Sequence, residues 1–114
     1  MILVKEKISN DELKPLSKKM YNNLVKAVVD IDQETMVVDA PLHSDEEEFL
    51  LEQGSLQENL WGINIYPDQI GSESWIEFDS LINIRPAENN RSRYIENPII
   101  REKIINIVKK LVQI

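Results

Sequence analysis

Arginine is concentrated in one short segment near the end of this 114-residue chain. Three of the four arginines lie within residues 85–93, and Arg101 follows on the next predicted helix. The guanidinium group presents a planar set of donors that matches phosphate and carboxylate oxygens, and the segment leads into a helix N-terminus, where free N–H groups also favour an anion. We therefore predict an anion site in this segment. Its candidate residues are Arg85, Asn89, Asn90, Arg91, Ser92, Arg93, Asp79 and Asn83.

The same segment also has an interpretation without a ligand. Asn and Ser are typical turn residues, because their side chains bond to nearby backbone groups. The arginines can pair with acids that are close in the sequence, namely Glu77, Asp79, Glu88 and Glu96. In that case the polar residues shape a loop and leave no donors for an anion. Both interpretations stay open at the level of the sequence.

A second polar cluster follows from strand periodicity. The positions of Glu77, Asp79, Asn83 and Arg85 differ by even numbers, so a single strand would point all four side chains to the same side. Asn64 would lie opposite Glu77 on the neighbouring strand. Two close carboxylates can act as general acid and base when one of them has a raised pKa. A solvated sheet face carries the same residues with no chemistry.

The only histidine, His43, precedes a run of acidic residues at 45–48. A histidine beside carboxylates can contribute to a metal site, but acids in the first turn of a helix are also explained by the helix dipole. The chain has no cysteine, no phosphate-binding glycine motif and no nucleophilic serine motif. We therefore predict no metal, no cofactor and no catalytic residue, and we favour a protein that is not an enzyme.

Charge divides the chain into three parts. Residues 27–84 hold 14 acidic residues and no Lys or Arg, whereas residues 1–26 carry a net +3 and residues 85–114 a net +4, which gives −7 overall. Such asymmetry can steer a basic protein partner, or a second copy of the chain, to the acidic middle. The same middle repels nucleic acid. Alternatively, the basic ends lie against the acidic middle in the fold.

The length is typical of one domain, so we predict a single domain over residues 1–114. No apolar run is long enough to cross a membrane, and the N-terminus has no signal-peptide pattern. Together with the absence of cysteine, this favours a cytoplasmic protein.

Periodicity and capping predict the elements that hold these residues. We expect strands within 2–7, 25–31, 36–40, 58–67 and 75–86, and helices whose N-caps are Ser9, Ser44 and Asn97. The order is therefore β-α-β-β-α-β-β-α. It predicts an α+β fold, a mostly antiparallel sheet with the helices packed on one apolar face.

The apolar residues also predict the register of both hairpins. The first pairs Ile31 with Met36, Val29 with Val38 and Ala27 with Ala40. The second pairs Tyr66 with Trp75, Ile65 with Ile76 and Ile63 with Phe78. It places Trp61, Ile63, Ile65, Ile76, Phe78, Ile82 and Ile84 in the core, and Asn64, Glu77, Asp79, Asn83 and Arg85 on the solvent side.

Three segments, "HSDEE", "QENLWGINIYP" and "FDSLINIRPAENNRSR" followed by "NPIIREKI", resemble the signature of an uncharacterised prokaryotic family of about this length, a domain of unknown function. The resemblance covers essentially the whole chain and implies no activity. It places the following residues in segments typical of that family: His43, Asn59, Asn64, Asp79, Asn83, Arg85, Asn89 and Arg91.

Two functions of different kinds remain. The one we favour is a non-catalytic protein-interaction or regulatory module with an acidic central surface, which would bind a protein partner or form a homodimer through its exposed strand edges. The alternative is a domain that binds an anionic or phosphate ligand, or a small enzyme, with Arg85–Arg93 beside Asp79 and Asn83 as its site. Convergence of Arg85, Arg91 and Asp79 in a concave pocket would favour the alternative.

Overall fold

The apolar strands assemble into one sheet. Its strands are Ile2–Val4 (β1), Val25–Asp30 (β3), Thr35–Val38 (β4), Leu60–Ile65 (β5) and Ile76–Glu77 (β6). They lie in the order β1-β4-β3-β5-β6, and each neighbouring pair is antiparallel. This computed structural model describes residues 1–20 and 22–114.

Helices, short 3-10 turns and one further strand pair surround the sheet. The α-helices are Asn10–Ser17 (α1), His43–Glu52 (α2) and Pro98–Leu111 (α3). The 3-10 turns are Gln57–Asn59 (η1), Pro67–Gln69 (η2), Leu81–Asn83 (η3) and Pro86–Glu88 (η4). A parallel pair, Ile8–Ser9 (β2) and Val112–Gln113 (β7), joins the start of α1 to the end of α3. No described helix is both long enough and apolar enough to cross a membrane.

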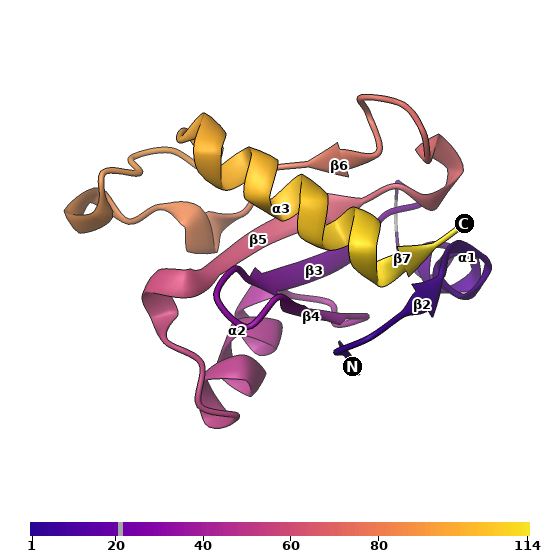
Figure 1. Cartoon of the computed structure of the whole chain (residues 1–114), viewed down its shortest axis with the longest axis horizontal. Helices are drawn as coiled ribbons and strands as arrows, with labels where there is room; N and C mark the ends of the chain where they lie inside the picture. The colour runs from indigo at the N-terminus through magenta and orange to yellow at the C-terminus, as the bar shows by residue number, and fades with distance from the viewer. Residues whose placement is uncertain (21) are drawn as a thin grey trace.

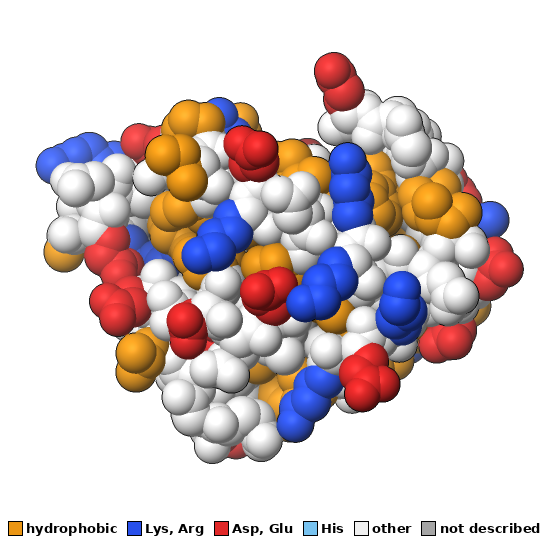
Figure 2. Space-filling view, viewed as in Figure 1, with side chains coloured by type: hydrophobic (Ala, Val, Ile, Leu, Met, Phe, Trp, Pro, Cys, Tyr) orange, Lys and Arg blue, Asp and Glu red, His pale blue; other side chains and the backbone are white. Residues whose placement is uncertain are grey.

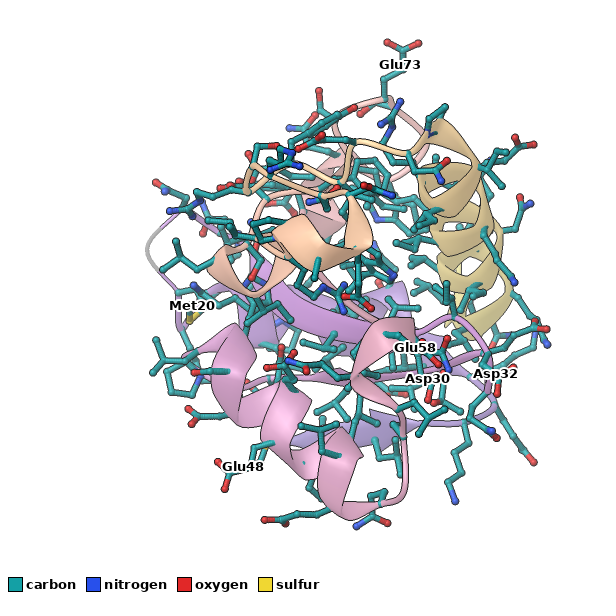
Figure 3. The ribbon with its side chains drawn as sticks, turned by 90° about the vertical axis from the view of Figure 1, so that its left-hand side faces the viewer. Met20, Asp30, Asp32, Glu48, Glu58 and Glu73 are labelled. Carbon is teal, nitrogen blue, oxygen red and sulfur yellow. The ribbon has the colours of Figure 1, made fainter. Side chains whose placement is uncertain are left out.

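Helices cover both faces of the sheet, with α3 and α2 on opposite sides in Figures 1 and 3. On one face Ala27 and Val29 of β3 join the main core together with Ile104 of α3. On the other face Val28 joins a smaller core together with Leu50 of α2. The predicted α+β fold and antiparallel sheet are confirmed. The prediction that all helices share one face is wrong, because β3 is apolar on both of its sides.

The first hairpin forms, but its register is shifted by two residues. Val29 pairs with Met36 and Ala27 with Val38, where the sequence pattern predicted Val38 and Ala40 as their partners. The Asp30 carboxylate accepts hydrogen bonds from the backbone N–H groups of Asp32 and Gln33, both at 2.9 Å, and so closes the turn earlier. A shift of two residues keeps the same side chains on the core face, which is why the apolar pattern could not detect it.

The second hairpin has the predicted register, with Ile65 opposite Ile76 and Asn64 opposite Glu77. Its second strand, however, ends at Glu77 instead of continuing to residue 85. Asn83 is fully buried and Ile84 is 41% exposed, which reverses the prediction for both residues.

β6 ends early because the chain leaves the sheet after Glu77. The Asn83 carboxamide then forms hydrogen bonds with the backbone of β5, as a neighbouring strand would. Its Oδ1 accepts from the Gly62 N–H at 2.9 Å and its Nδ2 donates to the Gly62 carbonyl at 3.0 Å. Gly62 permits this close approach, because a Cβ atom there would lie 2.6 Å from the Cβ of Ser80.

Local capping signals place two of the three helices correctly. Ser9 Oγ accepts from the Glu12 N–H at 3.0 Å at the start of α1, and Asn97 Oδ1 accepts from the Ile99 N–H at 2.9 Å at the start of α3. For α2 the predicted cap, Ser44, is wrong, because the N-cap is Leu42, without a side-chain cap bond. The first strand ends at Val4, which lies opposite Met36 of β4, instead of continuing to residue 7.

Candidate functional site

The arginine-rich segment is a loop whose guanidinium groups bind the protein itself. Arg85 donates to the carbonyls of Gln57 at 2.5 Å and Leu60 at 2.7 Å, and it lies over the Trp61 ring at 3.9 Å. Its Nε is 3.2 Å from a carboxylate oxygen of Glu88. Burial lowers the pKa of Arg85, although Glu88 opposes this effect. Arg85 therefore ties the loop to the first residues of β5.

Two further arginines are also engaged. Arg93 forms a bidentate ion pair with Asp79, with Nε at 2.7 Å and Nη2 at 3.2 Å from its two carboxylate oxygens. Arg101 donates to the carbonyls of Ile95 at 2.6 Å and Glu96 at 2.9 Å. The Arg91 side chain is exposed, and the described residues that line the pocket beside Asp79 include neither Arg85 nor Arg91.

The asparagines of the loop serve its backbone. Asn90 is buried, and its Nδ2 donates to the carbonyls of Asn83, Ser92 and Tyr94 at 2.7 to 3.0 Å. Its Oδ1 accepts from the N–H of Glu96 at 2.8 Å. Asn89 takes the left-handed conformation that ends η4, with φ of 62°. These are the turn roles that Asn adopts readily.

An anion cradle does exist in this loop, and a side chain of the loop occupies it. One carboxylate oxygen of Glu96 accepts from the backbone N–H groups of Arg91 and Ser92 and from Ser92 Oγ, all at 2.8 Å. The hydrogen bond from the Ser92 hydroxyl, followed by that from the Arg91 N–H, lowers the pKa of Glu96. The residue types thus point to anion binding, and the anion they hold in this structure is Glu96. Binding of an external anion by the eight candidate residues stays a prediction.

The polar sheet face contains a fixed carboxylate. Lys26, Asn64 and Glu77 lie in one row across β3, β5 and β6. Glu77 accepts from Asn64 Nδ2 at 2.8 Å and from the Tyr66 hydroxyl at 3.1 Å, and Asn64 also donates to the Asp79 carbonyl at 3.2 Å. Burial, then the charge of Glu77, raises the pKa of Tyr66. Glu77 is therefore held in place while it stays exposed to solvent.

Two buried titratable groups on α2 face the sheet. The Nε2 atom of His43 lies 2.7 Å from the Ile63 carbonyl, and burial lowers the pKa of His43 to about 4. A neutral ring donates through Nε2 in this contact and keeps its lone pair on Nδ1. Glu46 is fully buried, and burial raises its pKa to about 9.

From the sequence, Glu46 was assigned to the helix dipole or, with His43, to a possible metal site, although its position also indicated burial. Glu46 lies three residues after His43 and four before Leu50, on one helix face. Within the described residues, no three acidic or histidine side chains are placed to hold a metal ion together.

An open groove runs along β6 and is lined by acids and aromatic rings. We call it the β6 groove; its volume is about 820 Å³. Its acids are Glu73, Glu77 and Asp79, and its aromatic rings are Tyr66, Phe78 and Tyr94. The described residues that line it include no Lys, Arg or His. Figure 3 shows Glu73 at the tip of the loop before β6, pointing away from the body of the molecule.

A second groove adjoins the first and is mainly apolar. This α3 groove has a volume of about 550 Å³ and shares Glu73, Ile76 and Phe78 with the β6 groove. Its other side is formed by α3 and the C-terminal residues, with Lys109 as its one cation among the described residues. Figure 2 shows apolar side chains (orange) in the hollow beside the C-terminal half of α3.

A protein family of unknown function matches nearly the whole chain. The model of a family described as "Protein of unknown function (DUF5674)" matches residues 2–111. A search of curated proteins and a search of solved structures each returned no match.

Proposed function

The chain belongs to the DUF5674 family, and because that family carries no assigned activity, we propose a function from the geometry. The protein is a non-catalytic interaction module that binds a basic segment of a partner protein in the β6 groove. The observation that carries the proposal is the lining of this groove, which combines three carboxylates with three aromatic rings and, within the described residues, no cation.

The charge of the groove is only partly neutralised from within. Arg93 compensates Asp79. Glu77 is held by hydrogen bonds from neutral groups, which fix its position without cancelling its charge. Glu73 extends from the loop tip. Two carboxylates therefore remain to meet cations of a partner, and both belong to the segment of residues 27–84, which has 14 acids. Such a field also steers a basic partner toward the groove.

The aromatic rings suit the same partner. A guanidinium or ammonium group is attracted to the face of an aromatic ring. The protein contains this interaction already, since the Arg101 guanidinium lies 4.8 Å from the centre of the Tyr94 ring. Arginine or lysine side chains of a partner would find carboxylates and ring faces side by side in the β6 groove.

The alternative of an anion-binding domain has weaker support. Glu96 fills the cradle of backbone N–H groups, Asp79 binds Arg93, and Arg85 is committed to backbone carbonyls. An enzyme also has weak support at this site. Among the groups that line the β6 groove, Ser74 has no basic neighbour in the lining to activate it.

The test is binding of a fluorescently labelled arginine-rich peptide, followed by polarisation. We expect the double variant Glu73→Gln/Glu77→Gln to bind about five- to tenfold more weakly than the unchanged protein at low salt. The matched control is Glu48→Gln/Glu52→Gln, which removes the same charge from the exposed side of α2. Equal affinity of the two double variants would contradict the proposal, because net charge alone would then explain binding.

A further inference from the structure

We infer that the partner segment binds as an added β-strand against β6, with its basic side chains in the β6 groove and its apolar side chains in the α3 groove. This inference rests on the proposed function and specifies the class of partner: an extended segment in which basic and apolar residues alternate.

Among the described strands, β6 is an edge strand of the sheet, and none of them pairs with Ile76 on its outer side. On the inner side Glu77 pairs with Asn64, and the Trp75 carbonyl accepts from the Tyr66 N–H at 2.9 Å. Residues of an antiparallel strand direct their N–H and C=O groups alternately to the two sides. The N–H and C=O groups of Ile76, between those two residues, therefore point away from β5. Such an edge is the usual template for strand addition.

The chain already uses the neighbouring part of this edge. Asp79 forms an antiparallel bridge with Tyr94, and the N–H of Ile95 donates to the Phe78 carbonyl at 3.3 Å. The segment then turns away at Glu96, whose N–H binds Asn90. A partner strand antiparallel to β6 would bond to the edge at Ile76, next to the part of the edge that residues 93–95 occupy.

The two grooves lie on opposite sides of this edge, so alternate side chains of an added strand would enter different grooves. Ile76 and Phe78 belong to the core side of the sheet, and Glu77 lies with Asn64 on the polar side. In an added strand, the residue opposite Ile76 points to the core side and its two neighbours point to the polar side. An apolar residue therefore enters the α3 groove, and the basic residues on either side of it enter the β6 groove.

The charges of the two linings agree with this sorting. The side chains that line the α3 groove include one cation, Lys109, and one acid, Glu73, so they offer a basic side chain no net attraction. The carboxylates Glu77 and Asp79 line only the β6 groove. If the basic and apolar side chains of the partner strand exchanged places, cations would lie beside Lys109 and an apolar residue would lie among carboxylates. Both contacts are unfavourable.

The experiment compares three short labelled peptides on the unchanged protein. The first alternates arginine and leucine, the second contains the same residues in separate blocks, and the third is the alternating peptide with N-methylated backbone at its centre. We expect the alternating peptide to bind about tenfold more tightly than either other peptide. The block isomer cannot bury leucine while its arginines face the acids, and the methylated peptide cannot donate to Ile76.

A pair of variants tests the apolar side independently. Ile105→Lys places a second cation in the α3 groove, and Asn106→Lys places the same charge on the exposed side of α3. We expect only Ile105→Lys to abolish the preference for the alternating peptide. Far-ultraviolet circular dichroism and the melting temperature check that both variants fold, and the peptide comparison does not depend on them.

The outcomes separate this inference from the proposed function. If all three peptides bind equally and still depend on Glu73 and Glu77, the groove binds basic segments but strand addition is refuted. If none of the peptides binds, or if binding is indifferent to Glu73 and Glu77, the proposed function fails, and this inference fails with it.

Discussion

Glu46 allows a quantitative prediction about the stability of the protein. One of its carboxylate oxygens accepts from the Ala40 N–H at 3.2 Å, and the other is buried without a partner. Burial raises the pKa of Glu46 from 4.5 to about 9, although the Ala40 hydrogen bond and the charge of Lys26 oppose the effect. Glu46 is therefore protonated in the folded protein at neutral pH.

A raised pKa stabilises the folded state at low pH, and this contribution decreases as the pH rises. The contribution of Glu46 is complete below pH 4.5 and is lost as the pH approaches 9. Each pH unit in this window costs about 1.4 kcal/mol, so roughly 3 kcal/mol is lost by pH 7. That loss is large compared with the typical stability of a domain, about 5 to 15 kcal/mol.

His43 changes the pH dependence of stability in the opposite direction, and it therefore determines the pH range in which the effect of Glu46 can be measured. Its pKa is lowered from 6.5 to about 4 by burial, so its contribution is complete above pH 6.5 and is lost as the pH falls toward 4. Between pH 4.5 and 6.5 the two slopes cancel. Above pH 6.5 only the slope of Glu46 remains, and stability should fall.

The decisive variant is Glu46→Gln, which keeps the shape and the acceptor for Ala40 but cannot titrate. From pH 6.5 to 8.5 we expect the unfolding free energy of the unchanged protein to fall by about 3 kcal/mol and that of the variant to stay nearly constant. Urea unfolding at several pH values, followed by circular dichroism, measures both. Glu48→Gln is the control, because Glu48 lies on the exposed side of the same helix (Figure 3). Parallel pH slopes for the unchanged protein and Glu46→Gln would refute the reasoning.

Three further predictions concern the loop that replaces the end of β6. Gly62→Ala should lower stability by about 1 to 3 kcal/mol, because the new Cβ meets Ser80; a melting temperature equal to that of the unchanged protein would contradict this. Asn83→Ala should cost about 2 kcal/mol in urea unfolding, because the Gly62 N–H and C=O lose their partner; a loss as small as that for a surface Asn106→Ala control would show that Asn83 is dispensable. Glu96→Ala should empty the anion cradle, so inorganic phosphate should raise the melting temperature of this variant but not that of the unchanged protein. At a phosphate concentration ten times the dissociation constant, the variant should gain about 1.4 kcal/mol of stability. The absence of any phosphate effect on the variant would show that the cradle binds only a tethered carboxylate.

Local signals in the sequence predicted the local parts of the fold. Ser9 and Asn97 cap their helices as predicted, because a cap depends on residues within one turn. The pairing of Ile65 with Ile76 followed from alternation along two adjacent strands. The first hairpin shows the limit, since period-two alternation does not distinguish registers that differ by two residues, and the Asp30 carboxylate made that choice.

The end of β6 could not be predicted, because its cause is a contact between distant residues. Alternation continues through Ile82 and Ile84, so the sequence favours a longer strand. The structure instead depends on Gly62, 21 residues before Asn83, which lacks the side chain that would keep η3 away. An asparagine within a strand-like pattern also gives no indication that its carboxamide will pair as a peptide group does.

The anion site predicted from the sequence stays a prediction, although the loop contains donors that bind one of its own carboxylates. Residue types predicted anion recognition between residues 85 and 93, and the backbone cradle around Ser92 is there. Whether such donors remain free depends on which acid reaches them. The sequence offered Glu77, Asp79, Glu88 and Glu96 equally, and only the turn at Asn90 brings Glu96 back onto the loop.

The proposed function would account for a part of the unequal charge distribution that ion pairs within the chain leave unexplained. Basic residues of the two ends do reach acids of the middle, as in Lys18–Asp68, Lys19–Asp39 and Lys110–Glu34. These pairs are largely exposed, and such pairs contribute at most about 1 kcal/mol each. Under the proposed function, cations of the partner would pair with Glu73 and Glu77, which form no ion pair with the described residues of the isolated chain.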